Sequence, residues 1–245
     1  MASFMPTACC AAGYQHDGTP TGDVTAFEDL EIYTAKPSVA EPKKAILYLS
    51  DIYGFPVVNH KLLSDNFAKQ GYLTIYPNLF GDDPAPWPRT DEFDFPAWRE
   101  VHNIEVTEAI INKAIAYTKK EFPSVVQFFA VGYCFGGKYV VRLLDQAKID
   151  AGFVAHPTFV TDEELRAIQG PLSIAAAEVD HLMPEEKRHL TERILKEIGA
   201  TYILTLYSQV EHGFAVRGNP NEPATLWANE AAFIQAVQWF NRFSK

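Results

Sequence analysis

Apolar residues recur along the chain in short continuous runs that alternate with amphipathic stretches. The run 46–49 is typical of a strand buried on both faces, and similar runs predict strands at 72–76, 125–131, 151–155, 172–177 and 202–207. The stretches between them predict helices over 57–70, 98–120, 138–147 and 184–199, a short helix capped by Thr161 and Glu164, and a last helix from Pro223. This alternation predicts an α/β fold in which an open, mostly parallel sheet carries helices on both faces.

Two segments fall outside this rhythm. Residues 1–26 are rich in Gly, Thr, Ala and Pro without periodicity, so we expect an extended N-terminal arm before a short strand at 28–33. The stretch 78–96 holds four prolines and predicts a stiff excursion, either a lid over a pocket or a cover over the end of the sheet. No linker divides the chain, which favours a single domain over 1–245.

Composition and charge exclude several classes of protein. The 245 residues are 47% hydrophobic and 21% charged, which suits one globular domain and not a disordered or fibrous chain. The net charge of −10, without a basic tract, makes nucleic acid and anionic membranes poor partners. No apolar run is long enough to span a membrane. Three cysteines, and a first basic residue only at Lys36, favour a reducing, cytoplasmic location over secretion.

The segment Gly132-Tyr133-Cys134-Phe135-Gly136-Gly137 lies between a predicted strand and a predicted helix. A nucleophile elbow needs small residues two positions before and after the nucleophile, and Gly132 and Gly136 meet that need. The Cys134 thiol would then stand exposed at a helix N-terminus, where the dipole favours thiolate. A buried structural cysteine or a phosphate-binding loop is the alternative, although a dinucleotide loop belongs after the first strand.

Two later residues fit a catalytic triad with Cys134. Asp180 follows the predicted strand 172–177, and His212 follows the predicted strand 202–207. The order nucleophile, acid, histidine is that of the α/β-hydrolases, and it assigns attack to Cys134, proton transfer to His212 and orientation of the imidazole to Asp180. Asp180 could instead cap the next helix, and His181 and His156 are rivals for the base.

The loop after the run 46–49 offers further groups. The backbone N–H groups of Ile52 and Phe135 are our candidates for the oxyanion hole. Asp51 would place a carboxylate near the thiol, with a role in turn capping as the alternative. No pair of His or Cys has metal-ligand spacing with a third partner nearby, so no metal site is predicted.

From about Ile46 to the C-terminus these motifs resemble the dienelactone hydrolase family of the α/β-hydrolase fold. The resemblance rests on Cys134 in Gly-Tyr-Cys-Phe-Gly-Gly, Asp180 in Val-Asp-His and His212 in His-Gly-Phe. The arm, with Cys9-Cys10 and His-Asp-Gly-Thr-Pro-Thr-Gly at 16–22, resembles the fungal branch. The family cleaves lactones and small esters through an acyl-cysteine intermediate, which implies a small-molecule substrate and no cofactor.

This chain departs from the bacterial members at two positions. Asp51 stands where they carry a thiol-steering Glu, and Val216 stands where they carry an Arg, with Arg217 one residue later. Our candidates for substrate binding are Arg89, Trp98, Tyr133, His156, Phe214 and Arg217, with Trp87 as a further pocket wall. For each of these, packing or surface exposure is the alternative.

The function expected from the sequence is therefore cysteine-dependent hydrolysis of a lactone or small ester, by a monomer or homodimer. A second class is a protein that keeps the fold without hydrolysis, as a ligand-binding module or a catalyst of ring closure or isomerisation. A third is a thiol redox sensor that uses Cys134 with Cys9 or Cys10.

Overall fold

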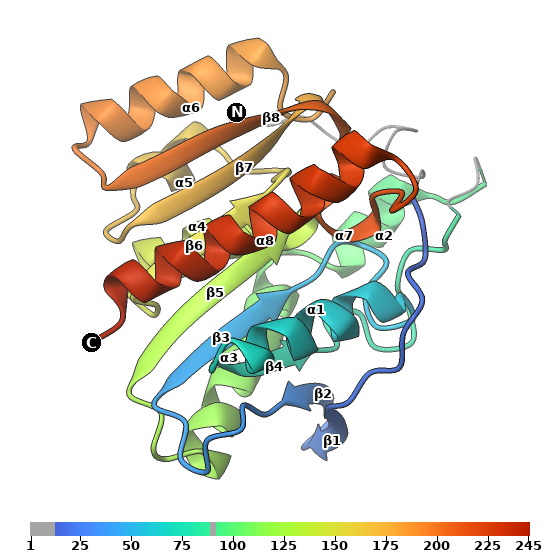
Figure 1. Cartoon of the computed structure of the whole chain (residues 1–245), viewed down its shortest axis with the longest axis vertical. Coiled ribbons are helices and arrows are strands. Elements are labelled where there is room, and N and C mark those ends of the chain that lie inside the picture. The colour runs from blue at the N-terminus through green and yellow to red at the C-terminus, as the bar shows by residue number, and fades with distance from the viewer. Residues whose placement is uncertain (1–12, 89–91) are drawn as a thin grey trace.

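The computed structural model describes residues 13–88 and 92–245, and these form one eight-stranded sheet (Figure 1). The strands are β1 (Asp23–Phe27), β2 (Leu30–Ala35), β3 (Lys44–Leu49), β4 (Leu73–Pro77), β5 (Gln127–Tyr133), β6 (Ala151–Ala155), β7 (Leu172–Val179) and β8 (Tyr202–Glu211). Their order is β1-β2-β4-β3-β5-β6-β7-β8. The pairs from β4 to β8 are parallel, whereas β1 and β2 are antiparallel to their neighbours. The expected α/β architecture is confirmed.

Helices cover both faces of this sheet. They are α1 (Val58–Lys69), α2 (Phe95–Val101), α3 (Ile104–Glu121), α4 (Phe135–Asp145), α5 (Asp162–Arg166), α6 (Glu185–Glu197), α7 (Phe214–Arg217) and α8 (Pro223–Phe243). In Figure 1, α1 and α8 lie in front of the sheet, and α3 and α4 lie behind it. None of the helices in the described ranges is long and apolar enough to cross a membrane.

Alternation along the strands produces two separate cores. In β3, Leu47 and Leu49 join one buried cluster, with residues of α3, α4 and α6. Ile46 and Tyr48 point to the opposite face, where their cluster includes residues of α1 and α8. Because both faces of β3 are buried, its sequence is a continuous apolar run. The sheet is therefore held rigidly from both sides, and its strand ends provide fixed positions for a site.

The N-terminal arm differs in part from the expectation. Its last residues form β1, which turns at Glu28 (φ 56°) into β2 as an antiparallel hairpin. The described residues before β1 form no strand, and hydrogen bonds hold them against the domain. The Tyr14 N–H donates to the Arg217 carbonyl at 2.8 Å. The Asn59 side chain donates to the carbonyls of Tyr14 and Val216, both at 2.8 Å. Residues 1–12 of the predicted arm, including Cys9 and Cys10, lie outside the described ranges.

The single helix predicted over 98–120 was wrong, because the chain forms α2 and α3 there. α2 ends at His102, whose Nε2 lies 2.9 Å from an Asp83 carboxylate oxygen. Asn103 then caps α3, since its side-chain oxygen accepts a hydrogen bond from the Val106 N–H at 3.0 Å. An asparagine cap satisfies backbone donors of a new helix start, and apolar periodicity alone does not reveal it.

Candidate active site

Cys134 occupies the sharp turn between β5 and α4. Its backbone has φ 51° and ψ −110°, a left-handed conformation that is strained for a residue with a side chain. A Cβ atom on Gly132 would lie 2.5 Å from the Gly136 carbonyl oxygen, and one on Gly136 would lie 2.2 Å from the Leu49 carbonyl oxygen. Both positions therefore require glycine, and the turn has the geometry of a nucleophile elbow.

The segment after β6 holds the elbow from the side. Cys134 N–H donates to the Ala155 carbonyl at 3.2 Å, and Thr158 N–H donates to the Cys134 carbonyl at 3.1 Å. The Cys134 sulfur lies 3.9 Å from the Thr158 hydroxyl oxygen, and the cysteine is 1% exposed, so the expected exposure of the thiol was wrong. Thr158 has no sequence signal that marks it as a neighbour of the thiol, because it lies in the loop after a different strand.

Asp180 and His212 are brought together by the adjacent strands β7 and β8. The His212 Nδ1 lies 2.9 Å from one Asp180 carboxylate oxygen, and both side chains are fully buried. The other Asp180 oxygen accepts from the backbone N–H groups of Leu182 and Met183, at 2.8 and 3.3 Å. The carboxylate therefore fixes the imidazole through Nδ1 and leaves Nε2 as the nitrogen for chemistry. His181, the neighbouring rival, is exposed.

The candidate oxyanion donors come from two sides of the elbow. Gly136 N–H donates to the Ser50 carbonyl at 3.1 Å, which ties the start of α4 to the loop after β3. Ile52 lies in that loop, and Phe135 is the first residue of α4. Neither the Ile52 nor the Phe135 N–H has a hydrogen-bond partner among the described residues. Two unengaged N–H groups beside a helix N-terminus suit a developing negative charge.

Asp51 lies in the same loop, and its contacts differ from the expectation. One carboxylate oxygen accepts from His60 Nε2 at 2.9 Å and from Tyr53 N–H at 3.0 Å, and the other accepts from Arg217 Nε at 2.8 Å. Both oxygens are thus occupied, so the described structure has no direct hydrogen bond between Asp51 and the Cys134 thiol. Burial alone would raise the pKa of Asp51, but the nearby His60 and Arg217 lower it below its ordinary range.

Arg217 is buried on α7, between Asp51 and the N-terminal arm. Burial alone lowers the pKa of the guanidinium, but the Asp51 carboxylate raises it, and Tyr53 and Cys134 add to that rise. The guanidinium carbon lies 4.9 Å from the centre of the Tyr53 ring. Arg217, a predicted substrate-binding residue, therefore already has a carboxylate partner within the protein.

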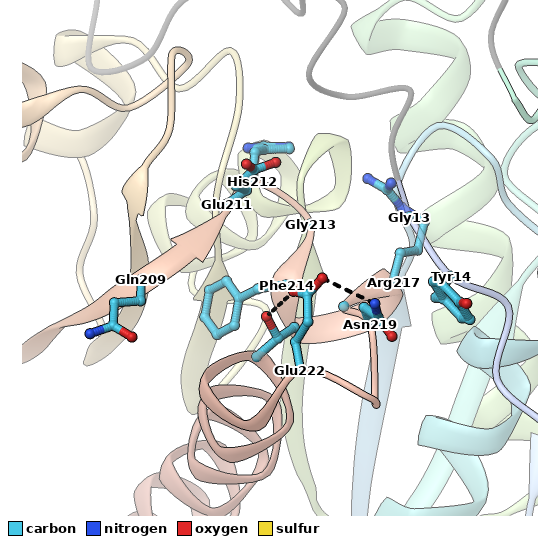
Figure 2. A pocket seen from close by; sticks show the side chains of 12 residues that line it. Gly13, Tyr14, Gln209, Glu211, His212, Gly213, Phe214, Arg217, Asn219 and Glu222 are labelled. Carbon is cyan, nitrogen blue, oxygen red and sulfur yellow. Dashed lines mark hydrogen bonds between the residues drawn. The ribbon is translucent and has the colours of Figure 1, made fainter.

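A pocket of about 350 Å³ opens beside these groups, and Figure 2 shows its lining. His212, which follows β8, and Phe214 of α7 line it, and Arg217 lies at the border with Gly13 and Tyr14 of the arm. Cys134 is not among the lining residues. The pocket reaches the candidate base from the surface, and the thiol lies deeper.

The remaining predicted binding residues fall into two groups. Tyr133, His156 and Phe214 are buried together, with the His156 ring 6.2 Å from the Tyr133 ring and 5.7 Å from the Phe214 ring. Trp98 instead packs among Phe80 and other rings of the 78–101 segment, and its indole N–H donates to the Asp83 carbonyl at 2.8 Å. Arg89 lies outside the described residues. The Trp98 ring also lies 5.9 Å from the ring of Phe135, which follows Cys134, whereas the first three stand beside the candidate triad.

His60 is the main residue that sequence reasoning missed. It lies on α1, fully buried, with Nε2 on Asp51 and Nδ1 3.0 Å from the Tyr48 hydroxyl. A histidine on the buried face of a helix, nine positions after an aspartate at a strand end, was the available signal. It becomes informative only when the fold places α1 beside the loop after β3.

Comparison with known proteins gives a consistent picture. The family model "Dienelactone hydrolase family" matches residues 30–244. "Hydrolase pyvD" of Aspergillus violaceofuscus is 42% identical over 245 residues, covering 100% of both chains. "Dienlactone hydrolase 1" of Gibberella moniliformis is 31% identical, covering 95% of this chain and 92% of its own length.

Solved structures agree on the fold. A "Putative Dienelactone Hydrolase" from Klebsiella pneumoniae superposes with a TM-score of 0.73 at 16% identity, covering 88% of this chain and 94% of that one. Family model, relatives and architecture point the same way, and residues 30–244 include the elbow, the Asp180–His212 pair and the Asp51 cluster. This chain belongs to the dienelactone hydrolase family.

Proposed function

We propose that this protein is a cysteine-dependent hydrolase that cleaves a lactone or small carboxylic ester through an acyl-cysteine intermediate. The observation that carries the proposal is the strained Cys134 elbow, on the same sheet edge as the buried Asp180–His212 pair. A strained nucleophile turn persists only where its surroundings hold it, and such strain clusters at functional sites. Family membership supports the reaction class, and the geometry supports the assignment of roles.

In this proposal the Cys134 sulfur attacks the substrate carbonyl carbon after His212 has taken the thiol proton. The N–H groups of Ile52 and Phe135 stabilise the resulting oxyanion, and the leaving alkoxide takes the proton from His212. Water, deprotonated by His212, then attacks the thioester carbon, and collapse of the second tetrahedral intermediate releases the carboxylic acid and restores the thiol. Asp180 holds the His212 Nδ1 throughout, so that Nε2 faces the reacting groups at every step.

The location belongs to the same proposal. Three cysteines, two of them adjacent in the chain, are typical of a protein from a reducing compartment, and they support the cytoplasm.

The test is hydrolysis of p-nitrophenyl acetate and a panel of enol lactones by the wild type and by Cys134→Ala, with mass spectrometry of the intact protein and of its peptides. We expect Cys134→Ala to lose at least about 10³-fold in kcat/KM. The wild type, quenched early, should carry an acetyl mass on the peptide that contains Cys134. The double variant Cys9→Ser with Cys10→Ser is the matched control and should keep its activity. Unchanged activity in Cys134→Ala would overturn the assignment.

A further inference from the structure

His156 ends the strand that lies between the strands of Cys134 and Asp180. It follows β6 directly, has φ 39°, and its N–H donates to the Ala175 carbonyl of β7 at 2.9 Å. Its ring centre lies 4.8 Å from that of His212. The imidazole is therefore fixed against the candidate base, on the elbow side of the site.

Both ring nitrogens of His156 are buried without a hydrogen-bond partner among the described residues, although the residue is 0% exposed. The other buried histidines of the described chain are bonded: both nitrogens of His60 have partners, His102 contacts Asp83, and His212 Nδ1 contacts Asp180. An unsatisfied buried donor and acceptor destabilise the fold, and proteins keep them mainly where a ligand or an ordered water completes them. The partner of His156 is thus expected from outside the described residues.

The surroundings decide which partner fits. Burial lowers the pKa of His156 well below its ordinary value, and the electrostatic effects of His212 and Arg217 lower it further, which favours the neutral ring at pH 7. A neutral imidazole offers one N–H donor and one lone pair, which suit a hydroxyl or a carbonyl oxygen. A substrate carboxylate would need a cation, and the nearby Arg217 is paired with Asp51 at 2.8 Å.

The neighbouring side chains add a preference for flat substrates. The rings of Tyr133 and Phe214 lie 6.2 and 5.7 Å from the His156 ring, and Phe214 also lines the pocket that reaches His212. Aromatic walls favour planar rings by stacking and edge contacts. An acyl group bound to Cys134 would be held next to these residues, because the elbow follows Tyr133 directly.

We propose that His156 is a specificity-determining residue that hydrogen-bonds an uncharged hydroxyl or carbonyl substituent of the substrate. The substrate is then a neutral, oxygen-substituted aromatic lactone or aryl ester rather than one that carries a carboxylate. This rests on the proposed function, because it places the substrate acyl group at Cys134. The proposal gives the unbonded His156 ring a partner on the substrate, and it narrows the substrate class beyond what the triad alone defines.

The test compares 3,4-dihydrocoumarins that carry hydrogen, hydroxyl or carboxylate at each aromatic position in turn. For the best-placed hydroxyl, we expect the wild-type kcat/KM to exceed that of the unsubstituted lactone at least tenfold, and that of the carboxylate by more. His156→Phe should remove this preference by lowering kcat/KM at least tenfold more for the hydroxylated lactone than for the unsubstituted one. His156→Asn, which tolerates the positive φ and keeps a donor and an acceptor, should restore part of the preference.

Two kinetic outcomes would overturn the inference. Equal losses on all lactones in His156→Phe, with matching circular dichroism and melting temperature, would mean that His156 only packs against His212. A wild-type preference for the carboxylate series would contradict the neutral substrate class.

Failure of the proposed function is a separate result, because it appears as the absence of an acetyl adduct on Cys134 with p-nitrophenyl acetate. In that case calorimetry measures binding of the same lactones to the wild type and to His156→Phe. A hydroxyl preference that is lost in the variant supports the site. Equal affinities in both proteins overturn it.

Discussion

Two buried aspartate–histidine pairs lie at the carboxyl edge of the same sheet, and both have a nitrogen-to-oxygen distance of 2.9 Å. Asp51 and His60 are joined through Nε2, whereas Asp180 and His212 are joined through Nδ1. In the first pair, the second histidine nitrogen contacts Tyr48 in the protein core. In the second pair, the histidine lines a pocket.

The difference shows that an aspartate–histidine contact does not by itself define a catalytic unit. The Asp51 pair is closed, because Arg217 and Tyr48 complete it from both ends. A closed, fully bonded cluster contributes to stability and fixes the local charge. In the Asp180 pair, His212 Nε2 is the nitrogen left for chemistry. This pair also follows Cys134 in the chain order of an α/β-hydrolase triad. We therefore expect substitutions in the two pairs to separate stability from turnover.

The largest expected effect is the loss of turnover in Asp180→Asn. The amide removes the negative charge that orients and stabilises the His212 ring, so kcat should fall by about 10³-fold or more. The midpoint of urea unfolding should change little, because the amide oxygen can still accept from the Leu182 and Met183 N–H groups. His60→Gln is the matched control in the other pair, and its kcat should stay within about tenfold. Equal kinetic losses in the two variants would contradict the division of roles.

The next effect is on stability, in Arg217→Met. This change leaves the fully buried Asp51 carboxylate without its cation, and breaking a buried pair in this way typically costs about 3–5 kcal/mol in the free energy of unfolding. Urea titration followed by circular dichroism measures the loss. Arg166→Met is the control, because its pair with Glu197 is half exposed and should contribute less than about 1 kcal/mol. Similar midpoints for the two variants would show that Asp51 is stabilised by other groups.

The same contrast explains what could be predicted from the sequence. Strands such as β3 and β6 are short apolar runs, and the elbow is set by local chemistry at Gly132 and Gly136, so both were predictable. The break between α2 and α3 was not, since it depends on the Asn103 cap and on a contact of His102 with Asp83. Local patterns predicted the elements, and long-range contacts decided their ends.

Candidate residues follow the same division. The strand order that predicts convergence of Asp180 and His212 is a property of the fold, so their 2.9 Å contact followed from topology. The Asp51 cluster joins a strand-end loop to α1 and α7, across 166 residues in the case of Arg217. No spacing in the sequence encodes that contact, so the sequence did not reveal that Arg217, a candidate for substrate binding that also lines the pocket, pairs with Asp51.

A smaller effect is expected in the pH dependence of stability. The pKa of Asp51 is lowered in the folded state, so its contribution is fully present above its unfolded pKa of about 4 and is lost as the pH falls towards the folded value. The difference in unfolding free energy between the wild type and Asp51→Asn should therefore be constant from pH 5 to 7 and shrink below pH 4. Urea titrations at pH 3, 5 and 7 measure it. A difference that grows on acidification would contradict the sign.

The smallest effect tests whether the Tyr48 hydroxyl stabilises the Asp51–His60 pair. In Tyr48→Phe the His60 Nδ1 loses its partner in the dry core, which should cost about 1–2 kcal/mol in the free energy of unfolding. Tyr72→Phe is a matched control, because its hydroxyl contacts Asn241 in a part-buried position and should cost less. Both variants should keep kcat within about threefold, since neither hydroxyl belongs to the site. A large fall in kcat for Tyr48→Phe without a change in stability would mean that the Asp51–His60 pair takes part in catalysis. The lost hydroxyl would then act on turnover through its contact with His60.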